Sequence, residues 1–227
     1  MNRLKNKVVL ITGATGGLGQ SVTTVFSNAG ATVVVAGRHA PKILPDGVLG
    51  FTADVTDETE VQRLVTEVKN KTKRIDCLIN LVGGFAMGRL TETKASDWSK
   101  MLTMNLTAAF LLSRAVVPSM IEQGAGRVIH IGARAALDPF PGAAAYLVSK
   151  SGLIAMIRVL ALELAGSGVN VNGVLPSIID TPTNRQNMPD ADYTEWVKPE
   201  SIAQLLVFLA SDEAGSINGG LIPIGSG

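Results

Sequence analysis

The sequence of 227 residues predicts a doubly wound α/β protein, in which helices cover both faces of a seven-stranded parallel sheet. Three observations support this prediction. Seven short segments are rich in apolar and β-branched residues, most stretches between them have the period of a helix, and the first strand leads directly into a glycine-rich turn. Strands separated by helices in this way pair in parallel through right-handed crossovers.

The predicted elements follow in chain order. The strands occupy residues 7–14, 31–37, 47–55, 76–82, 126–132, 168–176 and 219–225. A helix is predicted from Asp57 onward, because Asp57 and Glu60 have the spacing of a capping box. Its apolar stripe is formed by Val61, Leu64, Val65 and Val68. Two longer helices are predicted over residues 96–121 and 146–164, the first of them ending at Gly124.

Composition and charge narrow the classes of function. Hydrophobic residues make up 46% of the chain, enough for one compact core, so residues 1–227 are predicted to form a single domain. A net charge of +1 without a basic run disfavours nucleic-acid binding. The polar start and the lack of an apolar run near the roughly 20 residues of a membrane span predict a cytoplasmic protein without a membrane partner. Cys77 is the only cysteine, which excludes an internal disulfide, and His39 and His130 lack neighbouring ligands, so no metal site is predicted.

The first strand leads into "TGATGGLG", with Gly13, Gly17 and Gly19 at the turn and at the start of the next helix. Small residues there let backbone N–H groups and the positive helix end approach a diphosphate. Thr15 and Leu18 lie in the same turn and are expected to contact the same group. The alternative is a glycine-rich turn that binds no ligand.

The end of the second strand, "VVVAGRH", bears on the choice of dinucleotide. An acidic residue there would bind the ribose hydroxyls of NAD, but the chain has Gly37 at this point. Arg38 follows and can form charge-assisted hydrogen bonds with the 2′-phosphate of NADP. The sequence therefore favours NADPH/NADP, with NADH possible; the alternative for Arg38 is a solvated loop charge.

These and further motifs resemble, in their order, those of the short-chain dehydrogenase/reductase family. The matching segments are "TGATGGLG", "ADV", "LINLVGG", "MNLTAAF", "YLVSK" and "VLPSIIDT". The resemblance covers almost the whole chain and implies a Rossmann-type fold that binds NAD(P). The cofactor residues that it implies are Asp54 and Val55 at the adenine, Asn80 and Gly83 in "LINLVGG", Tyr146, Lys150, and Pro176, Ile179 and Thr181 at the nicotinamide. Two departures, "NLVG" for the usual "NNAG" and Ser177 in place of a glycine after Pro176, concern local turns.

Tyr146 and Lys150 are the predicted catalytic pair. Residues four apart lie on one face of a helix, so the Lys150 ammonium is expected to lie near the Tyr146 phenol and to lower its pKa. Tyr146 would then deliver a proton to the substrate. The resemblance implies that Asn105 holds a water linking Lys150 to solvent. The alternatives are an ordinary amphipathic pair, and an asparagine satisfied by local backbone.

One departure from the family concerns the chemistry. The family usually has a catalytic serine thirteen residues before its tyrosine, and this chain has Ala133 there. That serine gives a second hydrogen bond to a carbonyl oxygen, and losing such a donor costs on the order of 10²-fold in rate. Ser149 and Ser151 flank Lys150 but point to other helix faces, so neither is predicted to replace it. A reductase of ordinary ketones should suffer from this substitution.

One branch of the family, the dihydropteridine reductases, lacks this serine. The chain is similar to that branch in "GARAALDPFPG" and in "LPSIIDTPTNRQNMPDADYTEW". A quinonoid dihydropterin is already polarised, so hydride and one proton donor are expected to suffice. Phe85 falls where that branch has an aromatic residue against the flat substrate, and Met87 can add a soft contact. Core packing of Phe85 is the alternative.

Three functions remain open from the sequence. The first is an NADPH-preferring reductase of an activated planar small molecule, and the second is a general ketone or 3-oxoacyl reductase in which the serine loss is compensated. The third is a non-catalytic cofactor-binding or regulatory protein, against which the intact Asn105, Tyr146 and Lys150 argue. The two long helices carry apolar residues on more than one face, so a homodimer or homotetramer is expected.

Overall fold

The computed structural model describes residues 2–39 and 44–225, and its centre is one parallel sheet of seven strands. The strands are β1 (Val8–Thr12), β2 (Thr32–Gly37), β3 (Leu49–Thr52), β4 (Cys77–Asn80), β5 (Gly126–Ile131), β6 (Val169–Pro176) and β7 (Leu221–Ile224). They lie in the order β3-β2-β1-β4-β5-β6-β7, which confirms the predicted doubly wound sheet. The order reverses between β1 and β4, and ligands of such sheets bind at the carboxyl ends of the strands beside this switch point.

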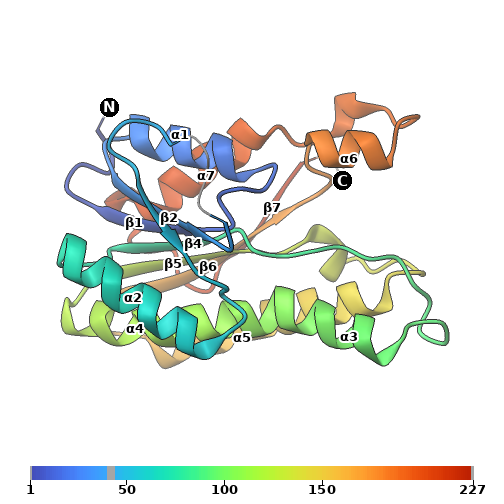
Figure 1. Cartoon of the computed structure of the whole chain (residues 1–227), viewed down its shortest axis with the longest axis horizontal. Coiled ribbons are helices and arrows are strands. Elements are labelled where there is room, and N and C mark those ends of the chain that lie inside the picture. Colours follow the sequence, from blue (N-terminus) through green and yellow to red (C-terminus); the bar gives the residue numbers. More distant parts are fainter. Residues whose placement is uncertain (1, 40–43, 226–227) are drawn as a thin grey trace.

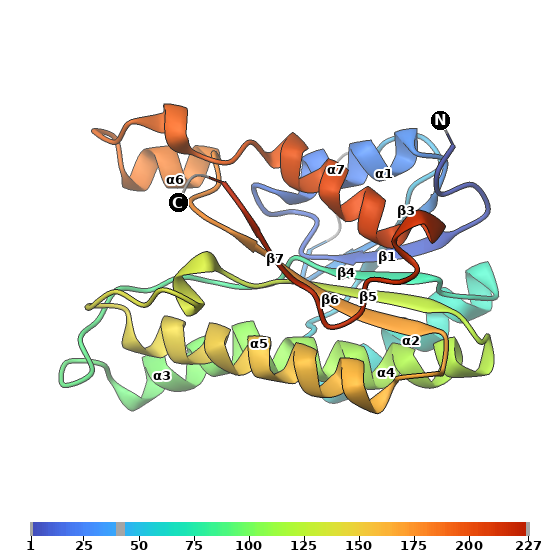
Figure 2. The ribbon, with the colours of Figure 1, turned by 180° about the vertical axis from the view of Figure 1, so that it is seen from behind.

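Helices cover both faces of the sheet, as predicted (Figures 1 and 2). On one face lie α1 (Gly19–Asn28) and α7 (Pro199–Ala210), and on the other lie α2 (Glu58–Thr72), α4 (Ala108–Glu122) and α5 (Ala144–Glu163). Alternate strand residues supply the two cores. Leu10 of β1 packs among the second group of helices, whereas Val9 and Ile11 pack with α1 and α7.

Helix α2 begins as the sequence predicts, with one difference. Asp57 caps it by accepting a 2.9 Å hydrogen bond from the Glu60 N–H, and the predicted apolar stripe is buried. The Glu60 carboxylate accepts instead from the Asp54 N–H, at 2.7 Å, so the reciprocal bond of a capping box is not formed. The Glu60 carboxylate therefore stabilises the chain at the end of β3, and it does not bond the N–H group at the start of α2.

The long helix predicted over 96–121 is present but not uniform. It consists of α3 (Ala95–Leu102), a π-helical turn at Thr103–Thr107, and α4, which ends before Gly124 as expected. The π turn contains the buried Asn105. Turns of this kind widen the helix by one residue and are frequent at functional sites.

Between β6 and α7 the chain forms a lid, defined as residues 177–197. It contains α6 (Pro182–Asn187) and a short 3₁₀ turn at Tyr193–Glu195, and a bridge between Ile179 and Val197 closes its base. Arg185 forms a bidentate ion pair with Asp180 and its guanidinium lies 4.6 Å from the centre of the Tyr193 ring. The lid projects from the carboxyl edge of the sheet (Figure 1) and is braced by its own side chains.

Two helical stretches, Ala95–Glu122 and Ala144–Glu163, are long and apolar enough to cross a membrane by length and composition. The expectation that no segment approaches that length is therefore wrong. About half of each stretch is buried inside the protein, 56% and 44% of the apolar windows respectively. Core helices of folded domains pass the same test, because one side of each faces a sheet.

Candidate active site

The glycine turn lies at the switch point and its close packing explains its glycines. Gly13 has a left-handed φ of 78°, and a Cβ there would lie 2.9 Å from the Val82 backbone nitrogen. A Cβ on Gly19 would collide with the Ala14 backbone. Helix α1 has Leu18 as its N-cap, which gives no side-chain hydrogen bond, and its first turn contains no acidic residue. Its N–H groups and positive end therefore suit the diphosphate of a dinucleotide.

The lid reaches this turn. A Cβ on Gly17 would lie 2.8 Å from the Thr181 side chain, so the segments predicted for the diphosphate and the nicotinamide are in contact. Thr181 caps α6 by accepting from the Asn184 N–H, and the Asn184 amide also donates to the Ile179 carbonyl at 2.8 Å. Pro176 is buried at the end of β6, just before the lid. The three predicted nicotinamide residues thus lie together, with Ile179 and Thr181 each accepting one bond from Asn184.

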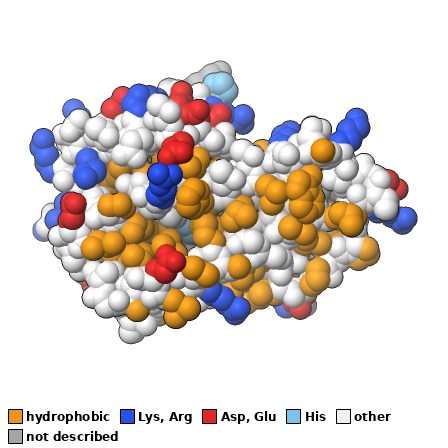
Figure 3. All heavy atoms as spheres, turned by 90° about the horizontal axis from the view of Figure 1, so that it is seen from below, with side chains coloured by type: hydrophobic (Ala, Val, Ile, Leu, Met, Phe, Trp, Pro, Cys, Tyr) orange, Lys and Arg blue, Asp and Glu red, His pale blue; other side chains and the backbone are white. Residues whose placement is uncertain are grey.

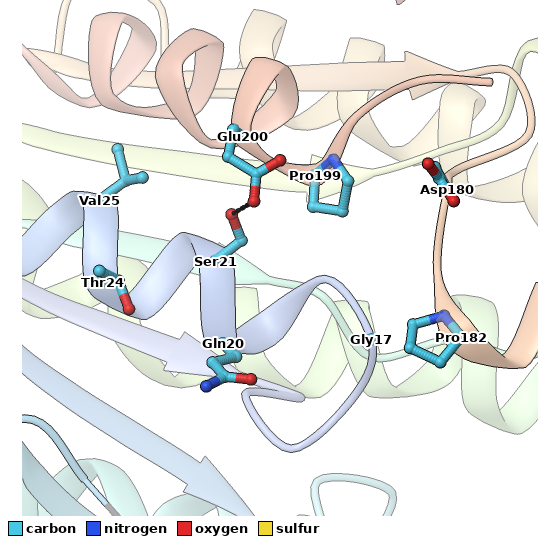
Figure 4. Close-up of a pocket in the computed structure, with 9 residues that line it drawn as sticks. All are labelled: Gly17, Gln20, Ser21, Thr24, Val25, Asp180, Pro182, Pro199 and Glu200. Atoms are coloured by element: carbon cyan, nitrogen blue, oxygen red, sulfur yellow. Dashed lines mark hydrogen bonds between the residues drawn. The ribbon is translucent and has the colours of Figure 1, made fainter. Parts of the chain in front are cut away.

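A hollow of about 350 Å³ lies beside the turn, between α1, α6 and α7 (Figure 4). Gly17 lies on one side of it, facing Asp180 and Pro182 across the opening. Its remaining walls are the outer sides of α1 and α7, where Ser21 donates to Glu200 at 2.9 Å. The carboxylate disfavours an anionic ligand, so the glycine turn suits the predicted diphosphate better than this hollow does.

The side of the site predicted for the adenosine contains three of the predicted cofactor residues, Arg38, Asp54 and Val55. Gly37 ends β2, and a Cβ there would meet its nearest atoms, one of them the Thr15 hydroxyl, at 3.8 Å, so a side chain would fit. Asp54 accepts from the Thr56 N–H and hydroxyl, which lowers the pKa of Asp54, and the nearby positive charge of Arg38 lowers it further. Arg38 is exposed and Val55 is buried. This edge thus has an exposed cation and no carboxylate at position 37.

Lys150 and Tyr146 lie on the first two turns of α5, but their electrostatics differ from expectation. Lys150 is buried, and its Nζ donates a 2.7 Å hydrogen bond to the Ile131 carbonyl. Burial lowers the pKa of Lys150 to about 8 and raises the pKa of Tyr146 to about 12. The predicted lowering of the Tyr146 pKa is therefore wrong, because desolvation of the buried phenolate raises it. A phenol of this kind stays protonated at neutral pH.

Asn105 holds the glycine loop, defined as Gly83 and Gly84, which follows β4. Its Oδ1 accepts from the Gly84 N–H at 2.9 Å, and its Nδ2 donates to the Gly84 carbonyl at 3.0 Å and to Ser149 Oγ at 3.0 Å. A Cβ on Gly83 would lie 2.7 Å from Asn105 Oδ1 and 3.2 Å from Lys150 Nζ. Both side chains therefore border the space that a Cβ on Gly83 would occupy, and they leave too little room for one. The amide that was expected to hold a water is engaged with protein atoms on both ends.

Asn80 belongs to a buried polar chain under the site. Its side chain accepts from Thr12 Oγ1 and from the Val82 N–H, and its Nδ2 lies 3.3 Å from His130 Nδ1. His130 Nε2 in turn lies 3.0 Å from Ser113 Oγ, and burial lowers the His130 pKa to about 3. The Asn80 side chain thus joins β1, β4 and β5, and leaves only its backbone for the predicted cofactor contact. Sequence reasoning missed this role of His130, because nothing in the pattern pairs it with Asn80.

Ala133 lies at the carboxyl end of β5, two residues after the carbonyl that Lys150 contacts. It is buried and extended, and its carbonyl accepts from the Ala136 N–H at the start of a 3₁₀ turn, Arg134–Ala136. Ser151 is exposed and its hydroxyl lies 3.4 Å from the Ala136 carbonyl. Ser149 points behind Tyr146, toward Asn105. Both serines therefore point away from a catalytic position, as predicted.

The loop after Gly84 forms the open side of the site. Phe85 is 57% exposed, and its ring stands edge-on to Tyr146 with centroids 4.9 Å apart. The alternative of core packing for Phe85 is therefore wrong. Met87 is 65% exposed, and hydrogen bonds between Gly88 and residues 142–144 tie this loop to the start of α5. A second hollow, of about 170 Å³, lies under Phe85 and is lined by Gly84, Phe85, Ala86, Asp97, Lys100, Met101 and Met104.

The described parts of the chain, 2–39 and 44–225, contain no group of three side chains able to hold a metal ion. The site thus offers a cradle for an anionic dinucleotide, a buried lysine and a protonated tyrosine at one edge of the sheet. Such a set suits hydride transfer accompanied by proton transfer.

Comparison with known proteins identifies the family. The family model for short chain dehydrogenases matches residues 7–192. The chain belongs to the short-chain dehydrogenase/reductase family. It is 34% identical to a 3-oxoacyl-[acyl-carrier-protein] reductase FabG of Thermotoga maritima, over 99% of this chain and 98% of that one. It is 32% identical to a meso-2,3-butanediol dehydrogenase of Serratia marcescens, over 99% and 95% of the two chains.

Solved structures agree with this assignment. A short-chain dehydrogenase/reductase from Burkholderia xenovorans superposes with a TM-score of 0.90, at 30% identity, over 98% of this chain and 96% of that one. The Rossmann-type fold of short-chain dehydrogenase/reductases is thereby confirmed. The chain is an oxidoreductase of a family that uses NAD(P)(H) and acts on small molecules.

Proposed function

We propose that this short-chain dehydrogenase/reductase reduces a small molecule with NADPH, using Tyr146 as the proton donor. The observation that carries the proposal is the pair on α5, in which a buried Lys150 follows Tyr146 by about one helical turn. A phenol that keeps its proton at neutral pH is an acid, and reduction of a carbonyl or imine needs an acid. The preference for NADPH rests on the exposed Arg38 and on Gly37, where an NAD-selecting carboxylate is absent.

When bound, NADPH supplies the hydride, and the residues of this chain do the rest. The uncapped start of α1 and the glycine turn would bind the diphosphate, and Pro176, Ile179 and Thr181 would hold the nicotinamide end; the closeness of Gly17 to Thr181 supports this assignment. Lys150, anchored on the Ile131 carbonyl and one turn after Tyr146 on α5, would place a positive charge at the ribose. Tyr146 then donates its proton to the substrate atom that gains negative charge. Asn105 fixes the glycine loop against Lys150.

For the substrate, we propose an activated planar molecule such as a quinonoid dihydropterin. Two features support this choice. Ala133 gives the site no second hydroxyl donor for a developing oxyanion, so a substrate that needs little oxyanion stabilisation is favoured. The exposed ring of Phe85 beside Tyr146 offers a flat apolar surface next to the proton donor.

The second candidate is a reductase of ketones or 3-oxoacyl groups, and the names of the relatives favour it. Two of them are 3-oxoacyl-[acyl-carrier-protein] reductases, from Thermotoga maritima and Haemophilus influenzae. In this case a water or a lid residue must replace the missing hydroxyl at Ala133. A non-catalytic cofactor-binding protein is the third candidate.

One assay separates the three candidates. Oxidation of NADPH is followed with quinonoid dihydropterin, with a 3-oxoacyl thioester and with a panel of ketones, for the parent and for Tyr146→Phe and Ala133→Ser. We expect turnover of the dihydropterin by the parent, a loss of roughly 10²-fold or more in Tyr146→Phe, and a gain in ketone reduction in Ala133→Ser. Efficient ketone reduction by the parent would support the second candidate. Micromolar NADPH binding without any turnover would support the third.

We also propose that the protein is a homodimer or homotetramer that pairs through α4 and α5. Apolar side chains gather on the face formed by the helices below the sheet (Figure 3). Among the exposed ones on α4 and α5 are Phe110, Val148, Val159 and Leu162, the last of which is 77% exposed. An apolar surface of this kind usually marks an interface. Light scattering of the parent and of Leu162→Glu tests the proposal, which predicts a smaller assembly for the variant.

A further inference from the structure

Ser149 is a fully buried hydroxyl on α5, between Tyr146 and Lys150. Its Oγ donates a 2.7 Å hydrogen bond to the Tyr146 carbonyl and accepts a 3.0 Å hydrogen bond from Asn105 Nδ2. One hydroxyl thus connects the first turn of α5 with the π turn of the neighbouring helix.

The two bonds of Ser149 determine which way the Asn105 amide faces. A hydroxyl has one hydrogen, and that of Ser149 is used by the Tyr146 carbonyl, so only its lone pair is available to Asn105. The Asn105 NH₂ group must therefore point toward α5. Its Oδ1 is left to accept from the Gly84 N–H. Both hydrogens of the NH₂ group have partners, in Gly84 and Ser149.

This orientation bears on Lys150. Asn105 Oδ1 and Lys150 Nζ both lie against the side of Gly83 that a Cβ would occupy, since an added Cβ would lie 2.7 Å from the first and 3.2 Å from the second. The glycine loop has no side chains of its own to fix its path. Its position relative to the ammonium depends on the bonds of Asn105, and these depend in part on Ser149.

We propose that Ser149 is a positioning residue. It acts through Asn105 to hold the glycine loop and the Tyr146–Lys150 pair in the relative positions that catalysis requires. It deepens the function proposed above and rests on it. Ser149 touches neither the reacting atoms nor the cofactor, because it points behind Tyr146 into the helix pair. Its removal should therefore slow the chemical step while leaving the binding of cofactor and substrate unchanged.

A double-mutant cycle tests the proposal on the full chain with NADPH and whichever substrate the parent turns over. The variants are Ser149→Ala, Asn105→Ala and the double variant, and Ser151→Ala is the matched control, because Ser151 is an exposed serine on the other side of Lys150. We expect Ser149→Ala to lower kcat about tenfold, with KM and the Kd for NADPH within about twofold of the parent. In the Asn105→Ala background the same change should have no further effect on kcat.

Two results would overturn the proposal. One is a loss in the double variant equal to the product of the two single losses, since the residues would then act independently. The other is a Ser149→Ala variant with unchanged kcat and a lowered melting temperature, which is the signature of a packing role. Should Ser149→Ala fail to fold, Ser149→Cys keeps the volume with a weaker hydrogen bond and takes its place in the cycle. Activity of the parent is measured in the same experiment, so failure of the underlying function is seen separately.

Discussion

The Nζ of Lys150 donates a 2.7 Å hydrogen bond to the carbonyl oxygen of Ile131, at the carboxyl end of β5. The ammonium is thus held by a backbone atom of the central sheet in a buried position. Its charge is costly there, which is why its pKa falls to about 8.

The rate of reduction should fall above about pH 8, because Lys150 loses its charge there while Tyr146, with a pKa near 12, keeps its proton. The measurement is kcat/KM between pH 6 and 10, which reports groups of the free enzyme. In Lys150→Arg the alkaline limb should move to higher pH, since a guanidinium stays charged. An alkaline limb that stays in place in Lys150→Arg would assign it to another group.

Lys150→Met should gain stability relative to the parent at neutral pH and lose that gain as pH rises from 8 to 10.5. The folded-state pKa of about 8 is below the ordinary 10.5, so the unfolded chain binds more protons in this window and the parent becomes more stable as pH rises through it. The variant lacks this contribution. Urea unfolding at pH 7, 8, 9 and 10 measures the free energy of unfolding of both proteins. The titration of buried Tyr146 and Cys77 cancels in the difference between them, because both proteins contain these residues. A pH-independent difference would contradict the prediction.

Gly37→Asp should shift the cofactor preference toward NADH. A Cβ at this position has at least 3.8 Å of space, so the carboxylate fits, and it would bind the ribose hydroxyls and repel a 2′-phosphate. We expect the ratio of kcat/KM for NADH to that for NADPH to rise at least tenfold, a difference of about 1.4 kcal/mol. Arg38→Ala is the companion variant and should weaken NADPH alone. An unchanged ratio in both would remove this edge of β2 from the cofactor site.

Phe85→Ala should raise KM for a planar substrate several-fold with little loss of stability. The ring is more than half exposed, so its removal leaves no core cavity, but it takes away the aromatic surface next to Tyr146. Steady-state kinetics and a melting curve are the two measurements. Ile121→Ala serves as control, because Ile121 is also exposed and lies at the far end of α4. A drop in melting temperature without a change in KM would assign Phe85 to packing.

Most of the fold could be predicted from the sequence, because it depends on local patterns. The alternation of β-branched strands and amphipathic helices and the glycine turn need no tertiary information, and all seven strands form the predicted parallel sheet. The Asp57 cap was predictable for the same reason. The hydrogen-bond partner of the Glu60 carboxylate could not be predicted, since it depends on where the end of β3 lies relative to α2.

The candidate site could be predicted less completely, because its electrostatics depend on burial. The spacing of Tyr146 and Lys150 places both on α5, but it does not show that the surroundings desolvate them. The π turn at Asn105 has no signal in the sequence, since its residues fit an ordinary helix. The sequence predicts only that Ser149 points to another helix face than Tyr146 and Lys150, because its bond to Asn105 depends on how the two helices pack.

The position of Gly225, directly after β7, has a practical consequence for handling the protein. The Gly225 carbonyl lies 3.4 Å from the Arg134 guanidinium, one residue from Ala133, and Gly225 packs closely on Ser177 at the base of the lid. The N-terminus lies at the opposite end of the sheet (Figure 2). An affinity tag or surface tether joined after β7 would start at the rim of the active site, so fusion and immobilisation belong at the N-terminal end.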